Sequence, residues 1–123
     1  MLLAVPASGA YLGVLRTATA GLAARLQFTL DEIEDLRIAV DEACAILLAV
    51  AALDAELACR FTVTDDTLTV EAAVPAASRA VRLPSGESFA WQVLSALTDE
   101  VSAQVINGRV MIQLTKRRPA NAI

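Results

Sequence analysis

The sequence contains no histidine, and its 123 residues include only two cysteines, Cys44 and Cys59, which are not in CxxC spacing. Catalytic triads and Cys–His pairs need an imidazole, and clustered metal sites need several Cys or His ligands, so these kinds of site are excluded. Both cysteines lie in periodic apolar segments and are expected to be small core residues. Free core thiols fit a reducing cytoplasm, and no metal site is expected.

Long apolar runs and an excess of basic charge are also absent. The longest uncharged apolar run, Ala43 to Leu53, is too short to span a bilayer, and no basic segment precedes an apolar one at the start to indicate a signal peptide. The net charge of -4 argues against a nucleic-acid surface and fits a basic protein partner. We therefore expect a cytoplasmic protein that contacts neither membrane nor nucleic acid.

Aromatic residues make up only 4% of a chain that is 56% hydrophobic, so the core must consist mainly of Ala, Val and Leu. The length suits one domain, which we place at residues 1–118, followed by a short tail at 119–123. The basic triplet Lys116-Arg117-Arg118 is interpreted as a solvated chain end.

Hydrophobic periodicity predicts eight elements in the order β-α-α-β-β-α-β-β. Thr29 and Glu32 form a capping box that starts the second helix, and Asn107-Gly108 between alternating segments predicts a hairpin. This order predicts an α/β fold of the α+β two-layer type, in which helices pack on one face of a mainly antiparallel sheet. The predicted helices cover about 9–26, 29–52 and 87–98, the predicted strands about 2–5, 57–63, 68–72, 101–106 and 109–115, and 75–86 is the one long loop.

The second helix carries the most informative motif of the chain. Its stretch RIAVDEAC contains Asp41, Glu42 and Ala43, and the segments VLSALTDEV and VMIQLTKRR follow near the end of the chain. Jointly these segments resemble the serine-kinase-type anti-sigma factors of the histidine-kinase-like (GHKL) ATPase superfamily, especially actinobacterial members with eroded nucleotide boxes. The likeness spans nearly the whole chain and implies the histidine-kinase-like ATPase fold, here with a short lid.

The resemblance also locates the nucleotide-binding positions, and their chemical groups are missing here. The magnesium-binding asparagine of the family falls on Ile46, whose aliphatic side chain cannot coordinate a cation that needs oxygen ligands. The adenine-binding Asp and glycines fall on Ala72 and the residues after it. The phosphate-binding Gly-x-Gly falls on Ser88, Phe89 and Ala90, where a phenylalanine is expected to crowd the approach of phosphate to the backbone.

These three losses predict that the chain binds no cofactor and acts without catalysis. Glu42 occupies the position at which a family member would activate the attacking hydroxyl, so it is the catalytic candidate only if ATP and magnesium bind. Its alternative is a solvated helix carboxylate. Trp91, the only tryptophan, is expected to fill the space of a nucleotide, with an exposed interface anchor as the alternative.

The first helix carries the predicted partner-binding surface. The arginine that contacts both the sigma factor and its antagonist in this family falls on Arg16, with Leu12 and Thr19 on neighbouring turns. The alternative is an ordinary solvated arginine.

Three functions stay open from the sequence. The leading one is a dimeric anti-sigma factor that sequesters an alternative sigma factor and is countered by an antagonist domain of the STAS type, without ATP hydrolysis. The second is an active ATP-dependent serine kinase that phosphorylates its antagonist. The third is a dimeric, non-catalytic adaptor that uses the apolar surface from Ala45 to Leu53.

Overall fold

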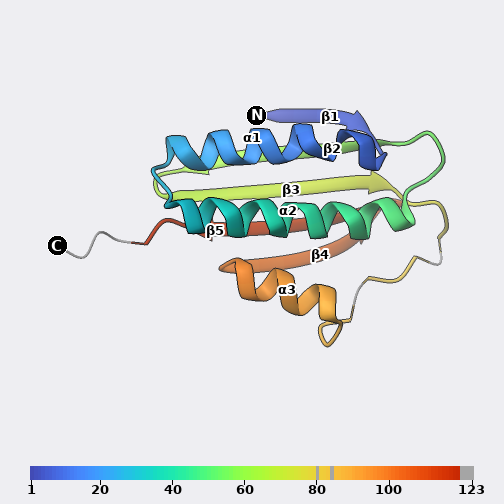
Figure 1. Cartoon of the computed structure of the whole chain (residues 1–123). Coiled ribbons are helices and arrows are strands. Elements are labelled where there is room, and N and C mark those ends of the chain that lie inside the picture. The colour runs from blue at the N-terminus through green and yellow to red at the C-terminus, as the bar shows by residue number, and fades with distance from the viewer. Residues whose placement is uncertain (80, 84, 120–123) are drawn as a thin grey trace.

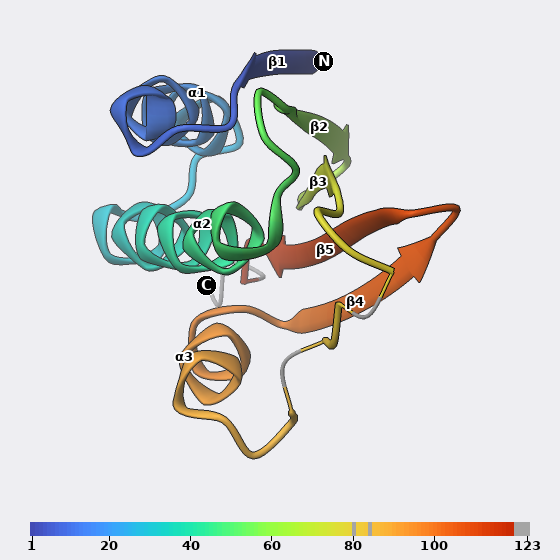
Figure 2. The ribbon, with the colours of Figure 1, turned by 90° about the vertical axis from the view of Figure 1, so that its right-hand side faces the viewer.

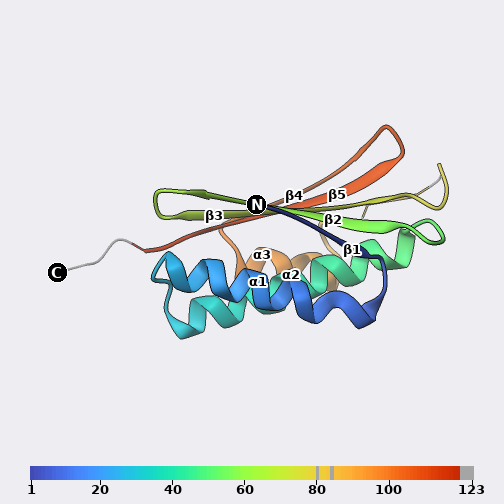
Figure 3. The ribbon, with the colours of Figure 1, turned by 90° about the horizontal axis from the view of Figure 1, so that it is seen from above.

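Five strands form one antiparallel sheet, and three α-helices cover one of its faces (Figures 1 and 3). The computed structural model describes residues 1–79, 81–83 and 85–119, so residues 120–123 of the predicted tail lie outside the described part. The spatial strand order is β1-β2-β3-β5-β4. The elements in chain order are β1 (Leu2–Pro6), the 3-10 turn η1 (Gly9–Tyr11), α1 (Leu12–Arg25), α2 (Leu30–Val50), β2 (Glu56–Thr64), β3 (Thr67–Pro75), α3 (Phe89–Leu97), β4 (Glu100–Ile106) and β5 (Arg109–Arg117). The predicted element order and fold class are thereby confirmed.

Helix boundaries follow from local capping chemistry. The hydroxyl of Thr29 accepts a hydrogen bond from the Glu32 amide, and the Glu32 carboxylate accepts one from the Thr29 amide, which completes the predicted capping box. The end of α1 is a Schellman motif: Gln27 adopts a φ of 62°, and the Phe28 amide donates to the Ala23 carbonyl. The first predicted helix differs at its start, where η1 precedes α1.

Tight turns set the register of the sheet. Asn107 and Gly108 both have positive φ, 52° and 77°, as a type I′ turn requires, and they join β4 to β5 with Ile106 opposite Arg109. The β2–β3 hairpin turns at Asp65, whose φ is 49°. These registers place alternate side chains of β2, β3 and β5 beneath the helices.

The core lies between the helix layer and the sheet, with α2 at its centre. Along one face of α2, Leu36, Val40, Ala43 and Leu47 are buried, and Ile33 packs partly buried against them. The other large, fully buried side chains come from α1, α3 and the three central strands, and no single aromatic residue dominates them. They are Leu15, Leu57, Leu68, Val70, Val74, Leu94, Val110, Ile112 and Leu114.

The basic end of β5 is part of the fold, and the prediction of a solvated chain end is wrong for two of its residues. Lys116 is only 15% exposed, and its ammonium donates to the Leu97 carbonyl at the end of α3. Arg118 donates to the Leu26 carbonyl after α1. Cations at helix C-termini donate to otherwise unpaired carbonyls and complement the helix dipole, which explains why Lys116 and Arg118 contact the ends of α3 and α1.

Candidate functional site

The positions that the resemblance assigns to nucleotide binding lie on α2, on β3 and at the start of α3, and α2 contacts each of the other two elements (Figure 2). The end of α2 is joined to the end of β3 by an isolated bridge between Ala51 and Ala76. The Ala52 amide donates to Pro75 and the Ala77 amide to Val50, both at 2.9 Å. The chain that leaves β3 is therefore held against α2 before it enters the loop to α3.

The magnesium and adenine positions are apolar in the folded protein. Ile46 lies partly buried on α2 and packs against the core cluster. Ala72 is buried on the inner face of β3, opposite Cys59 of β2 and Ile112 of β5. Neither side chain offers an oxygen to a cation or to an adenine amine.

The start of α3 is capped by its own chain. Ser88 is the N-cap, and its hydroxyl accepts the Trp91 amide at 3.2 Å, while the Ser85 hydroxyl accepts the Glu87 amide at 3.0 Å. An amide of the kind that could bind a phosphate at a helix N-terminus is thus already paired. Ala90 follows within the helix, partly buried.

Phe89 is 81% exposed, because it is the first residue of α3 and the helix buries the side that carries Leu94. Five residues along an α-helix correspond to a rotation of about 140°, which directs the ring away from the core. Trp91, by contrast, is partly buried and packs against the core cluster. That the Phe89 ring crowds the approach of a phosphate to this helix start stays a prediction.

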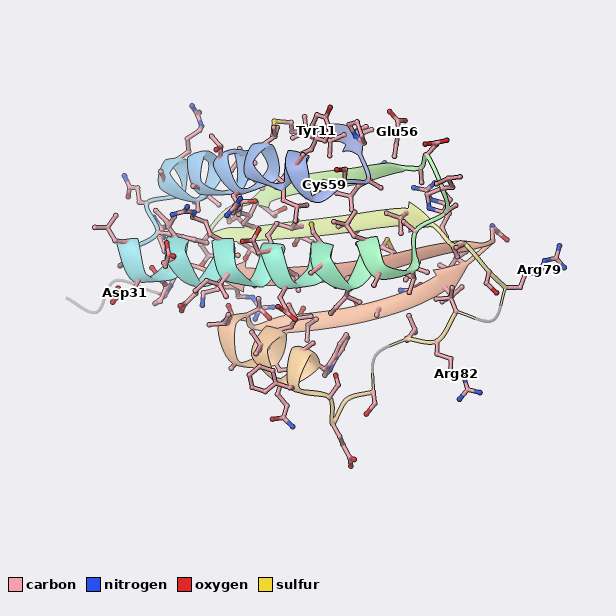
Figure 4. All side chains as sticks on the ribbon, turned by 45° about the vertical axis from the view of Figure 1, so that its right-hand side comes forward. Tyr11, Asp31, Glu56, Cys59, Arg79 and Arg82 are labelled. Carbon is pink, nitrogen blue, oxygen red and sulfur yellow. The ribbon has the colours of Figure 1, made fainter. Side chains whose placement is uncertain are left out.

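The loop between β3 and α3 covers residues 76–88, of which 80 and 84 lie outside the described part. Arg79 and Arg82 extend from it into solvent (Figure 4). Within the described residues no group of three or more Cys, Asp or Glu side chains could hold a metal ion. No described helix is long and apolar enough to cross a membrane.

The two acidic residues of the RIAVDEAC motif have different surroundings. Asp41 of α2 forms an ion pair with Arg16 of α1, in which Arg16 Nε lies 3.3 Å from Asp41 Oδ1. Glu42 is partly buried, and in the described part of the chain its carboxylate makes no hydrogen bond or ion pair. The pair Arg16–Asp41 was not predicted, because residues 25 apart in sequence are brought together only by the packing of α1 on α2.

The predicted partner surface on α1 is only partly accessible. The Arg16 side chain is 41% exposed, whereas Leu12 packs partly buried against the core. Thr19 is fully buried, and its hydroxyl donates to the Leu15 carbonyl at 2.7 Å. Thr19 is therefore not available to a partner, and Arg16 remains as the exposed polar group of the predicted set.

A further surface lies between α1 and the edge strand β1. This surface is a groove with a mainly apolar lining, which includes the exposed residues Met1 and Val14. The sequence did not predict the groove, because its lining combines residues of two elements. The groove is lined by Met1, Leu3, Gly13, Val14, Thr17 and Ala18. Within the described residues β1 pairs with β2 alone, so its other edge is open.

Comparison with known proteins finds relatives of one kind. The chain is 34% identical to the protein named anti-sigma-F factor RsbW of Mycobacterium tuberculosis strain H37Rv, over 90% of this chain and 69% of that protein. It is 30% identical to the serine-protein kinase RsbW of Bacillus licheniformis strain ATCC 14580, over 90% of this chain and 81% of that protein.

A shorter match, 44% identical, links 54% of the chain to the serine-protein kinase RsbW of Bacillus subtilis strain 168, of which it spans 43%. The chain thus covers less than half of that relative's length. No family model matches the sequence.

Proposed function

The chain belongs to the RsbW family of serine-kinase-type anti-sigma factors, and from this premise we propose that it sequesters an alternative sigma factor by binding alone. An antagonist domain of the STAS type would compete for the same surface, and the complex would form in the cytoplasm. The mycobacterial relative is named an anti-sigma-F factor, which supports a sigma factor as the partner class.

One observation supports the binding-only proposal: the fold matches the family's, while the magnesium and adenine positions carry apolar residues. Ile46 and Ala72 offer no oxygen ligand, and the Ser88 hydroxyl caps α3. Phosphoryl transfer depends on metal ions that neutralise the phosphate charge and on groups that position it. A protein that has lost these groups can still bind partners through its helix layer.

Under this proposal, regulation follows from mass action. Without phosphorylation of the antagonist, the share of free sigma factor is set by the concentrations and affinities of the three proteins. The single exposed cation of the predicted surface, Arg16, would contact a carboxylate of either partner.

Titration of the purified chain with each purified alternative sigma factor of its own genome tests the proposal. We expect one member of this panel to bind, and Arg16→Glu to weaken that binding by about tenfold or more, since it replaces attraction with repulsion. Arg25→Glu, at the other end of α1, is the matched control and should leave the affinity unchanged. Absence of binding across the panel would contradict an anti-sigma function.

An active kinase is the second candidate, and the free carboxylate of Glu42 is the observation that favours it. ATP and magnesium would then be required, and Glu42 would accept the proton of the attacking hydroxyl. Transfer of radiolabelled phosphate to an antagonist, abolished by Glu42→Gln, would support this function. Glu34→Gln on the same helix is the control.

We also propose that the protein is a homodimer formed at the β1 edge. The residues of β1 have no charged side chain that would discourage strand pairing, and the neighbouring groove exposes Val14. Val14→Lys should then shift the sedimentation coefficient to that of a monomer. Val105→Lys, at a similarly exposed position on β4, is the control; equal behaviour of the two variants would contradict this dimer surface.

A further inference from the structure

Arg16 packs against α2 so that the Nε atom of its guanidinium is buried, while another part of the side chain is exposed to solvent. Its Nε atom is inaccessible to solvent and lies 3.3 Å from Oδ1 of Asp41, although 41% of the side chain is exposed. The exposure therefore belongs to other atoms of the side chain. Its Nη2 lies over Gly13, 3.8 Å from where a Cβ would stand on that residue.

Asp41 is the only anionic partner of Arg16 in the described part of the chain. No hydrogen bond to Nη1 or Nη2 occurs there, and no second carboxylate lies within 4.0 Å of the guanidinium. The Nε–Oδ1 contact does not have hydrogen-bond geometry, so Asp41 acts on Nε mainly through charge. The donors at the Nη end are left for a group from outside the chain.

We propose that Asp41 is a positioning residue, which fixes the guanidinium of Arg16 through its Nε side and presents the Nη side to a carboxylate of the protein partner. This inference rests on the proposed function. A free arginine side chain loses rotamer freedom when it is immobilised on binding, and a side chain already held in place loses less. Asp41 would thus raise partner affinity without touching the partner.

The neighbouring acidic residue has a different role in this arrangement. Asp41 is turned to α1, whereas Glu42 has no ion pair among the described residues. In the RIAVDEAC motif, Asp41 would then serve partner binding, whereas the next residue, Glu42, is the candidate catalytic residue. A test must therefore distinguish the effect of the Asp41 carboxylate from that of the other negatively charged side chains on α2.

The experiment measures two quantities in wild type, Asp41→Asn and Asp41→Glu. One is the Kd for the sigma factor that binds most tightly in the panel titration, and the other is the solvent exchange rate of the Arg16 Nε–H by ¹⁵N NMR. We expect Asp41→Asn to weaken binding by about 3- to 10-fold, the cost of ordering one long side chain, and to speed the exchange. Asp41→Glu should restore part of the affinity.

Two controls exclude a merely structural effect. Glu34→Gln breaks the exposed Arg37–Glu34 pair of the same helix, 3.0 Å long, and should leave the affinity unchanged. In an Arg16→Lys background, which lacks the guanidinium, Asp41→Asn should change the affinity by less than about twofold, the range expected of independent sites.

Three results would overturn the proposal. The first is an Asp41→Asn affinity within about twofold of wild type, and the second is an equal loss in the wild-type and Arg16→Lys backgrounds. The third is an Nε–H exchange rate that Asp41→Asn leaves unchanged. If wild type binds no member of the panel, the anti-sigma function fails, and the exchange rate alone decides whether Asp41 positions Arg16.

Discussion

At the scale of the residue, burial decides the chemistry of the two cysteines. Cys44 and Cys59 are free and almost completely shielded from solvent, as the sequence predicted. Burial raises the pKa of both thiols to about 12, and for Cys44 the charges of Cys59 and Asp41 add to this effect. Cys59 lies on the side of the sheet that the helices cover (Figure 4). A protonated, inaccessible thiol is a poor nucleophile and a poor metal ligand.

The raised pKa values predict a loss of stability at alkaline pH. In the unfolded chain a thiol ionises near its ordinary pKa of about 8.5, whereas in the folded protein it keeps its proton to about pH 12. The free energy of unfolding is therefore unaffected by these thiols below about pH 8.5, and it falls as the pH rises from about 8.5 towards about 12. Between about pH 8 and about pH 10 the unfolding free energy should fall by about 2 kcal/mol per thiol.

Urea unfolding at the two pH values measures this loss. The variant Cys44→Ala/Cys59→Ala is less stable at both pH values because it loses core contacts, but its pH dependence should be shallower by the contribution of both thiols. An identical pH dependence in the variant and the wild type would contradict the assignment to these cysteines.

At the scale of the element, the capping box of α2 offers a direct prediction. Thr29→Ala removes the hydroxyl that accepts the Glu32 amide, and we expect it to lower the unfolding free energy by about 1 kcal/mol. Urea denaturation measures the difference. Thr17→Ala is the matched control, since the exposed Thr17 hydroxyl donates to Gly13 within α1 and caps nothing; an equal effect of both substitutions would argue against the cap.

The contact between β5 and α3 leads to a second prediction at this scale. Lys116→Met leaves the Leu97 carbonyl without its donor and Asp35 without its ion pair at 3.8 Å, so stability should fall by about 1–2 kcal/mol. Arg117→Met removes the exposed pair with Glu100 and should cost less than about 1 kcal/mol. Thermal and urea unfolding of both variants compare the two positions, and a larger loss for Arg117→Met would contradict this ranking.

At the scale of the whole molecule, the apolar residues Ile46 and Ala72 at the expected ligand positions predict that ATP does not stabilise the fold. A ligand present at a thousand times its Kd would raise the unfolding free energy by about 4 kcal/mol, which corresponds to a shift in Tm of roughly 10 °C or more. We expect the Tm in millimolar ATP and magnesium to equal that in magnesium alone, as read by calorimetry. A shift of that size would show that a nucleotide site has survived despite Ile46 and Ala72.

The candidate site could be predicted in its chemistry but only partly in its geometry. That Ile46 and Ala72 carry no ligand oxygen is a property of residue type, which the sequence states directly. The exposure of Phe89 depends on which side of α3 is buried. In the same way, Thr19 is buried because it lies on the side of α1 that packs against the core. The periodicity of a short helix does not specify which neighbour covers it.

The sequence alone determined the element order, the helix start at Thr29, the hairpin at Asn107-Gly108 and the missing ligand groups, because each depends on residues close together in the chain. Only the tertiary structure decided the ion pair of Arg16 with Asp41, the groove beside β1 and the helix-capping role of Lys116. These features join residues distant in sequence, and their positions are fixed by packing between elements.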